Sequence, residues 1–489
     1  MLHTKLMSTR LLSAILVALM IGTASPAVAT TVAPLTLVSG PSPFASCTIG
    51  GGPGAINYTN AEVEPFIAVN PTDPRNIIGV WQQDRWSDGG ARGLVAGASF
   101  DGGKTWSETP QPFSACAPNG LSYERASDPW VSFGPDGTAY SVSISFNESN
   151  NHNAVAAAVS KDGGRTWTNL RTIIADNADN FQFFNDKESV TADPVRAGVA
   201  YAVWDRLTTP NGNPDASLHT SAFTGPTYFA KTTDGGLTWS TPQIIVTTGQ
   251  HRQTIGNQIV VDPRNGTLYD FFDLIVPPNS RPYNVAFIKS TDGGNTWTVP
   301  QTIATIATVF VSDPNTGQAI RTGDIIPEPA INPATGQLYV VWQDSRFNGG
   351  NYDEVAFSTS TDGGATWSTP IRVNTPTGRP AFTPMVRVNS AGVVGVTYYD
   401  FRNLQAGNTT TLPTDYWFTT STNGGASFGN EAHLAGPFDM LTAPFASGFF
   451  VGDYEGMDVA GTTFQPFFVA ANSGNTSNRT DVFTTNTMP

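Results

Sequence analysis

Apolar and polar residues alternate in short runs along most of the chain, and Gly, Pro or Asn bounds each run. The segment 328–374 is typical: "EPAINP" is followed by "GQLYVVWQDSR", "DEVAFSTS" and, after a turn, "TWSTPIRVN". Runs of this length that are rich in Val, Ile, Phe, Tyr and Thr predict β-strands. From residue 30 onwards we find no stretch with the 3.6-residue period of an amphipathic helix. The pattern predicts an all-β fold.

A short motif recurs between the third and fourth predicted strands of each such segment. It reads "STDGGNTWT" at 290–298. Its acidic position recurs at intervals of about 60–70 residues, which marks an internal repeat. The residues at this position, in chain order, are Asp101, Asp162, Asp234, Asp292, Asp362 and Asn423. Repeated units of four antiparallel strands predict a single β-propeller.

The residue types of the motif suit a turn. The Asp carboxylate can accept hydrogen bonds from the N–H groups of its own turn, and two glycines supply positive φ values at little steric cost. The Trp begins the next strand and can pack between neighbouring sheets. We therefore interpret the six copies as turn-stabilising elements, and six separate ligand sites are the alternative.

A seventh unit follows the six that carry the motif. Residues 452–485 contain "GDYEGMDVA", "FQPFFVAANSG" and "RTDVFTT", which resemble the first three strands of the other units. The missing fourth strand can come from "APLTLVSGPSPFASC" near the N-terminus. Closing the ring in this way removes exposed sheet edges. We expect seven blades, with six as the alternative.

The first 29 residues have the features of a secretory signal peptide. Lys5 and Arg10 precede an apolar run at 11–21, and "AVA" at 27–29 suits cleavage. We therefore expect one secreted domain at 30–489, and a monomer. Later apolar runs fall short of the ~20 residues needed to span a bilayer.

The chain is acidic, and it contains two cysteines. The formal net charge of −14 becomes −16 when Lys5 and Arg10 are removed. This charge argues against nucleic acid or an anionic membrane surface as partners. Cys47 and Cys116 lie in matching contexts, "PFASC" and "PFSAC", and in an exported protein such a pair predicts a disulfide.

Charged residues recur at the end of each unit opposite the motif. First strands open with Glu64, Asp128, Glu188, Glu328 and Asp453-Tyr454, and second strands close with Asp84-Arg85, Asp205-Arg206, Asp344 with Arg346, and Asp400 with Arg402. Two interpretations stay open. The Asp–Arg pairs can be ion pairs between blades, or this face can be the binding face.

The motif S/T-x-D-G-G-x-T-W resembles the Asp box of the sialidase (neuraminidase) superfamily. The resemblance implies a propeller that acts on glycans, with three arginines holding the substrate carboxylate, an Asp as acid/base and a Tyr nucleophile activated by a Glu. The segment 81–107 is similar to the family stretch that implies Arg85 as a carboxylate-binding arginine. It also implies Asp88 as the acid/base, with Asp84 as the second candidate.

The remaining family roles map less directly. By position, Arg346 and Arg402 are candidates for the other arginines. The nucleophile pair is Tyr454 with Glu455, or Tyr399 with Asp400. Glu64 stands where the family has its first arginine, and a carboxylate there would repel a sialic acid.

Four functions are consistent with these residues. The first is a secreted sialidase-like glycoside hydrolase that acts on extracellular glycans. A variant hydrolyses a neutral sugar with paired carboxylates drawn from Glu64, Asp128, Glu188 and Glu328. The third is a non-catalytic, lectin-like propeller in which exposed Trp86 and Trp130 stack on sugar rings. The fourth is a calcium-stabilised scaffold, although no dedicated calcium loop or zinc-ligand spacing is present. We expect no cofactor and no catalytic metal.

Overall fold

The computed structural model describes residues 30–178, 183–208, 224–276 and 283–489, so the expected signal peptide lies outside the described residues. Within these ranges the regular structure is β-strand, apart from the single-turn 3₁₀ helices η2 (Arg346–Asn348) and η3 (Met440–Thr442). No helix in this part of the chain has the length and hydropathy required to cross a membrane. The prediction of an all-β protein is confirmed.

Six consecutive units each contain four antiparallel strands paired in chain order. The first unit consists of β3 (Glu62–Val69), β4 (Ile77–Arg85), β5 (Ala91–Ser99) and β6 (Ser107–Pro110). The second consists of β7 (Arg125–Phe133), β8 (Ala139–Phe146), β9 (Asn153–Ser160) and β10 (Thr168–Asp176). The third consists of β11 (Phe183–Ala192), β12 (Ala200–Thr208), β14 (Thr227–Thr232) and β15 (Gln243–Val246). The fourth unit consists of β16 (Arg252–Val261), β17 (Leu268–Ile275), β18 (Asn284–Ser290) and β19 (Gln301–Thr305). The fifth consists of β21 (Glu328–Ile331), β22 (Leu338–Asp344), β23 (Glu354–Ser360) and β24 (Ile371–Arg372). The sixth consists of β25 (Ala381–Val388), β26 (Val394–Asp400), β27 (Pro413–Ser421) and β28 (Gly429–Asp439).

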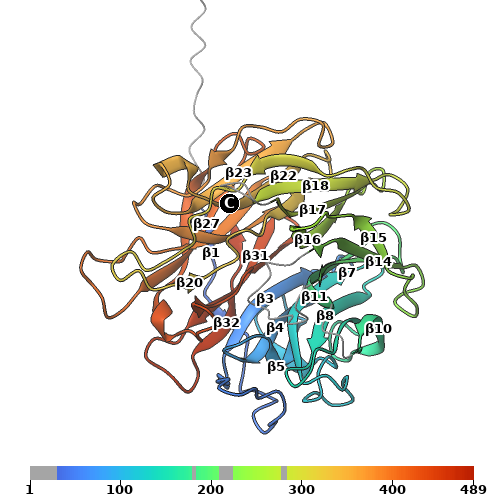
Figure 1. The fold of residues 1–489 in the computed structure, drawn as a ribbon. Helices are drawn as coiled ribbons and strands as arrows, with labels where there is room; N and C mark the ends of the chain where they lie inside the picture. The colour runs from blue at the N-terminus through green and yellow to red at the C-terminus, as the bar shows by residue number, and fades with distance from the viewer. Residues whose placement is uncertain (1–29, 179–182, 209–223, 277–282) are drawn as a thin grey trace, which may run out of the picture.

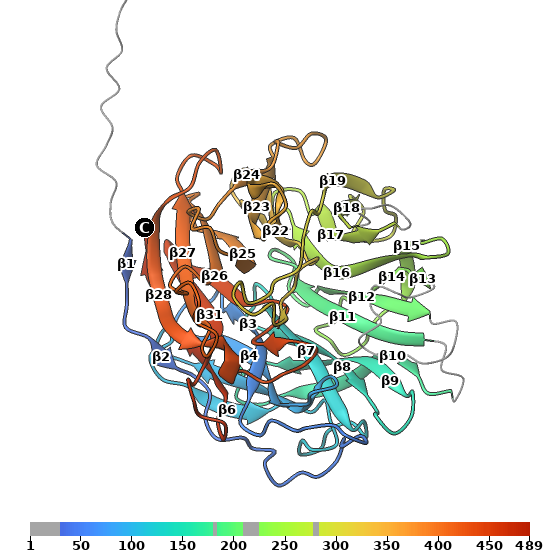
Figure 2. The same cartoon turned by 60° about the vertical axis from the view of Figure 1, so that its left-hand side comes forward.

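The last sheet combines strands from both ends of the chain. β30 (Gly456–Ala460), β31 (Thr463–Ala471) and β32 (Thr480–Thr484) pair in order, and β2 (Thr36–Leu37) adds to β32. β1 (Thr31–Val32) and β33 (Thr487–Met488) extend the other side of β31, an addition that the sequence did not indicate. Figures 1 and 2 show the units arranged around a common centre, with the blue N-terminal strands beside the red C-terminal ones. The fold is a propeller-like ring.

The motif turns connect the third and fourth strands of the six units, and they lock neighbouring units together. In the fourth unit, Asp292 Oδ1 accepts the N–H of Thr296 at 2.9 Å and Asp292 Oδ2 accepts its hydroxyl at 2.6 Å. Trp297 packs against Phe229 of the preceding unit, with ring centroids 5.5 Å apart. The same contact is made by Trp106 on Phe467, Trp367 on Phe287 and Phe428 on Phe357. These geometries are those of turn-stabilising elements.

A disulfide joins two loops beside the first unit. Cys47 and Cys116 are bonded, with Cα atoms 5.7 Å apart, as the sequence predicted. The bridge closes a loop across 69 residues. It ties the N-terminal segment that follows β2 to the loop between β6 and β7.

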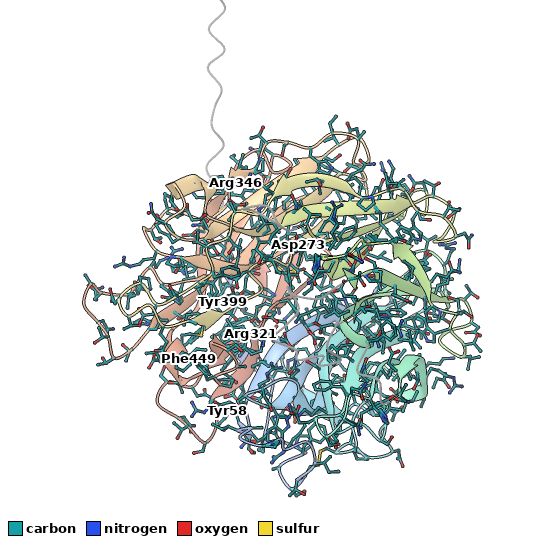
Figure 3. All side chains as sticks on the ribbon, in the orientation of Figure 1. Tyr58, Asp273, Arg321, Arg346, Tyr399 and Phe449 are labelled. Atoms are coloured by element: carbon teal, nitrogen blue, oxygen red, sulfur yellow. A yellow bond between two sulfur atoms is a disulfide. The ribbon has the colours of Figure 1, made fainter. Side chains whose placement is uncertain are left out.

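Two short strands lie outside the regular units and cross the face opposite the motif turns. β20 (Ile320–Arg321) pairs in parallel with β29 (Phe449–Phe450). Figure 3 shows Arg321 near the centre of the ring and Phe449 farther out. These strands carry a charged side chain to the middle of the ring, where the candidate site lies.

Candidate functional site

Five of the first strands bulge at the same point. The pairing register of β3, β7, β11, β16 and β25 with the second strand shifts after the first few residues. A bulge adds an unpaired residue and turns its side chain away from the ladder. The first bulged residues all have positive φ: Glu64 (53°), Asp128 (51°), Lys187 (47°), Gly256 (70°) and Thr383 (47°). For a non-glycine residue this conformation costs about 1–3 kcal/mol and tends to occur at functional sites.

Three of these bulges bring ionised groups into one buried cluster. Lys187 Nζ contacts Glu64 Oε1 at 3.1 Å and Asp128 Oδ1 at 2.7 Å. The same nitrogen contacts Asp453 Oδ2 at 2.8 Å, just before β30. The Lys187 side chain is only 6% exposed. We call these four residues the lysine-centred cluster.

Two arginines complete the charge balance around the lysine-centred cluster. Arg321 donates to both oxygens of Asp453, from Nε at 3.1 Å and from Nη2 at 2.7 Å. Arg85 is buried at the end of β4, where Nη1 donates to Gln82 Oε1 at 2.7 Å. Both guanidiniums lie over the Phe450 ring, 4.9 Å from its centroid for Arg85 and 4.4 Å for Arg321. Three cations therefore face three carboxylates.

The environment separates the pKa values of these carboxylates. Burial, reinforced by the charge of Asp128, raises the pKa of Glu64 to about 7. Burial also opposes ionisation of Asp453, but Arg321 and Lys187 outweigh it and hold its pKa well below the usual range. The surrounding carboxylates raise the pKa of Lys187 despite its burial. Carboxylates with pKa values pushed apart in this way are suited to acid and base roles.

Tyr454 and Glu455 point to different parts of the protein. Tyr454 lies 3% exposed beside the lysine-centred cluster, with Lys187 Nζ 5.6 Å from its ring centroid. Burial and the nearby carboxylates raise its pKa well above the ordinary value. Glu455 instead accepts the N–H of Val469 at 3.1 Å and lies near Tyr399. The structure thus separates the first candidate nucleophile pair. It also separates the second, because Asp400 binds Arg402 and Tyr399 donates to the carbonyl of Val469.

The three candidate arginines do not converge. Arg346 binds Asp344 of its own unit, and Arg402 binds Asp400 and Glu431. Figure 3 places Arg346 away from the central Arg321. Arg85 alone reaches the charged centre. For Arg346 and Arg402 the geometry is that of ion pairs within one unit.

Asp88 lies at the edge of this region, in the turn between β4 and β5. Its two oxygens contact the buried Arg125 guanidinium at 2.8 and 3.3 Å. The second candidate for the same role, Asp84, accepts hydrogen bonds from Ser42 and Arg92 at 2.7 and 3.2 Å. Neither carboxylate contacts the lysine-centred cluster.

The other predicted carboxylates lie deeper in the ring. Neither oxygen of Glu188 has a hydrogen-bond partner among the described residues, and burial raises its pKa well above the ordinary value. Glu328 Oε1 accepts the amide of Gln258 at 2.9 Å, and burial raises its pKa to about 7. Of the four carboxylates predicted for this face, Glu64 and Asp128 share the lysine contact.

The expected exposure of two tryptophans is wrong. Trp86 and Trp130 are each only 6% exposed. Trp130 stacks on Phe66 with centroids 3.7 Å apart, and Trp86 lies under Arg125, whose guanidinium carbon is 5.0 Å from the ring centroid. Each ring is buried by contacts within the protein, so neither can stack on a sugar at the surface.

Sequence reasoning missed Lys187 and Arg321. The sequence pattern puts Glu188 at the position equivalent to Glu64 and Asp128, which is one residue out of register. The positive φ shows that Lys187 is the equivalent residue. The sequence does contain a signal for this register: the apolar residues that follow each bulge have the same spacing from Lys187 as from Glu64 and Asp128. Arg321 lies on a strand outside the repeat, and no pattern marked it.

Comparison with known proteins supports the repeat. Residues 198–326 match the family model described as BNR repeat-like domain. This segment is therefore similar to the repeats of that family. No curated protein matches the sequence.

Solved structures with similar folds include several glycoside hydrolases. The α-L-arabinanase of Penicillium chrysogenum is 13% identical, over 88% of this chain and 98% of its own, with a TM-score of 0.45. A Hadza microbial sialidase is 15% identical, over 82% and 75%, with a TM-score of 0.47. The α-L-arabinofuranosidase of Fusarium graminearum is 15% identical, over 70% and 91%, with a TM-score of 0.45.

Proposed function

We propose that the protein is a secreted glycoside hydrolase of the Asp-box propeller type that acts on neutral residues of extracellular glycans. On this proposal the ring has seven blades, the last closed by β2. The observation that carries the proposal is the contact of Glu64 and Asp128 with one nitrogen, that of Lys187. Two oxygens held by one nitrogen are separated by a distance on the order of the ~5–5.5 Å between the carboxyl groups of a retaining glycosidase.

The roles are assigned from the pKa of Glu64 and from the contacts of Lys187. With a pKa of about 7, roughly half of the Glu64 carboxyl groups carry their proton near neutral pH, and Glu64 is the proposed general acid for the leaving oxygen. Asp128 is the proposed partner carboxylate, acting on the anomeric carbon directly or through water. Lys187 holds both carboxylates in place. Asp453, doubly bound by Arg321 and Lys187, fixes the lysine and is not the reacting group.

Two features favour a neutral sugar over sialic acid. A sialic acid carboxylate needs a group of free cations, yet Arg346 and Arg402 are bound within their own units. The cations at the centre already face carboxylates, and Asp186 adds a further one to the lining of the same cavity. A further anion beside Glu64 and Asp128 would be repelled, and burial enlarges that penalty.

The test is hydrolysis of a panel of neutral 4-nitrophenyl glycosides and of sialyl-lactose by the purified protein. We expect turnover of at least one neutral glycoside, and Glu64→Gln should lower kcat about 10²–10⁴-fold, the range for loss of a general acid. Glu328→Gln is the matched control, because Glu328 is equally buried with a similar pKa but lies away from Lys187. Turnover of sialyl-lactose alone, or equal loss in both variants, would refute the proposal.

Non-catalytic glycan binding is the second candidate, and one observation favours it. The cavity lined by Glu64, Asp128 and Lys187 measures about 20 Å³, which is far smaller than a sugar ring, and this argues against turnover at Glu64 but not against glycan binding elsewhere on the surface. If glycans bind without turnover and Glu64→Gln binds them equally well, this candidate replaces the first. A structural calcium ion is a separate proposal, tested by comparing Tm with and without a chelator. In the described ranges, no group of three or more His, Cys, Asp or Glu has metal-binding geometry.

A further inference from the structure

A second and larger cavity occupies the centre of the ring. It measures about 630 Å³ and is lined by the later halves of the first strands, including Ile67, Val131, Val190 and Val260. First and third strands run in the same direction, because each is antiparallel to the second. The cavity therefore lies toward the face of the motif turns and away from the lysine-centred cluster.

An aromatic layer separates the cavity from the lysine-centred cluster. Phe66 and Trp130 line the cavity and stack at 3.7 Å between centroids. Tyr454 follows, with its ring centroid 5.1 Å from that of Trp130, and its other side approaches Lys187. This aromatic layer thus lies between the cavity and the proposed hydrolytic site.

One cation in the cavity wall has unused donors. Arg387 of β25 lies over Phe66, with its guanidinium carbon 5.7 Å from the ring centroid. Its Nη1 donates to the Val386 carbonyl at 2.8 Å and to Met385 Sδ at 3.2 Å. Among the described residues, neither Nε nor Nη2 of Arg387 has a hydrogen-bond acceptor. An arginine fork without a partner in a cavity suits a carboxylate, which it can bind through two donors.

The neighbouring carboxylates do not occupy that fork. Asp458 Oδ2 accepts the N–H of Val69 at 2.7 Å, and its Oδ1 accepts the N–H of Val459 at 2.8 Å. Glu328 Oε1 is taken by Gln258. Burial lowers the pKa of Arg387, and the nearby carboxyl groups of Asp458 and Glu328 partly offset this by favouring its charged form. The same two groups would oppose a second negative charge on a ligand. The site therefore favours a single anionic group.

We infer that the central cavity binds an amphiphilic monocarboxylate, with its carboxylate on Arg387 and its apolar body against the aliphatic walls and the Phe66–Trp130 layer. A volume of about 630 Å³ lies within the ~300–1,000 Å³ range of small-molecule sites. This binding is separate from the proposed hydrolysis and does not depend on it.

The test is calorimetric titration of the full-length protein with decanoate and with 1-decanol. We expect decanoate to bind, and Arg387→Met to weaken that binding at least tenfold while the affinity for 1-decanol changes less than twofold. Arg372→Met is the matched control, because Arg372 lies on the outer strand β24 and faces Glu354. It should leave both affinities unchanged.

A second variant addresses the cavity without touching the charge. Val260→Trp fills the cavity from a wall residue and should abolish binding of both probes, with a circular dichroism melt to verify folding. The inference is overturned if the unmutated protein binds neither probe, or if Val260→Trp folds and binds decanoate normally. It is also overturned if Arg387→Met folds and binds decanoate as tightly as before. None of these outcomes bears on the glycosidase assays.

Discussion

The motif turns and the first-strand bulges are both repeated around the ring, but they repeat different things. In the turns the side chains recur: five aspartates and one asparagine make the same hydrogen bonds to their own turn. In the bulges the backbone recurs, with positive φ at five positions, while the side chain changes from Glu to Asp, Lys, Gly and Thr.

The difference separates structure from candidate chemistry. A ring that repeats one side chain in every unit uses it for the same task in every unit, here turn formation and contact with the preceding unit. A ring that repeats a strained backbone with different side chains produces one asymmetric constellation. Glu64, Asp128 and Lys187 meet because the same bulge presents three different groups to the centre.

The largest effect we expect comes from Lys187→Met. Removing the shared cation leaves buried Glu64 and Asp128 without their cationic contact, while Asp453 keeps Arg321, and this should lower the free energy of unfolding by about 3–5 kcal/mol. Urea denaturation measures it. Lys104→Met is the matched control, since Lys104 is exposed in a motif turn, and it should change stability by about 0.5 kcal/mol or less.

A further variant sharpens the first prediction. Adding Glu64→Gln to Lys187→Met removes a buried carboxyl group that has lost its cationic contact and should restore part of the lost stability. If Lys187→Met is as stable as the unmodified protein, the bulges are not held by the charge cluster. The distinction between the two kinds of repeat would then lose its physical basis.

The next prediction tests the motif turns with two adjacent glycines. Gly293 and Gly294 have φ values of 70° and 84°. A Cβ on Gly294 would lie 2.5 Å from Phe229 Cζ, whereas one on Gly293 meets nothing closer than 3.8 Å. Thermal unfolding should show that Gly293→Ala costs about 1 kcal/mol through backbone strain. Gly294→Ala should cost about 2–4 kcal/mol, because overpacking adds to the strain.

The glycine pair has its own control. Adding Phe229→Leu to Gly294→Ala should relieve the clash and restore that part of the lost stability. The cost of the backbone strain should remain. Equal costs for the two single variants would show that contact between units does not depend on the second glycine.

A carboxylate of the motif turns and a buried carboxylate of a first strand should also respond to pH with opposite signs. Hydrogen bonds from Thr105 lower the pKa of Asp101 from 3.8 to about 2, so its contribution to stability is lost as the pH falls from about 4 to about 2. Burial raises the pKa of Glu328 from 4.5 to about 7, so its neutral form stabilises the fold at low pH and that contribution is lost as the pH rises from about 4.5 to about 7.

Stability measured across pH should therefore peak near pH 4–5. Asp101→Asn should flatten the acid side of the profile, and Glu328→Gln should flatten the neutral side. The interpretation fails if either variant changes the opposite side instead.

The repeated features of this protein can be predicted from its sequence, whereas the residues that break the repeat cannot. The all-β fold, the motif turns and the Cys47–Cys116 disulfide follow from patterns that a single chain displays. Glu64 and Asp128 are predicted for the candidate face because each opens a first strand in the repeated pattern. Lys187 was missed because the bulge shifts the register by one residue. Arg321 reaches the centre on a strand that belongs to no repeat, so its position depends on tertiary packing.

The smallest expected effect concerns the one turn that departs from the repeat. Asn423 Oδ1 accepts the N–H of Ser427 at 3.1 Å, and its Nδ2 donates to the Ser427 hydroxyl at 2.9 Å. With Asn423→Asp the hydroxyl can donate to a carboxylate instead, as Thr296 does to Asp292, and charge assistance strengthens both bonds.

The turn is exposed, so the gain in Asn423→Asp should stay below about 0.5 kcal/mol and appear as a small rise in Tm. It should also be lost as the pH falls from about 4 to about 2, as for Asp101 in the first turn. A gain that persists at pH 2 would show that the sixth turn is limited by its backbone. The equivalence of the six turns would then extend to their shape but not to their energetics.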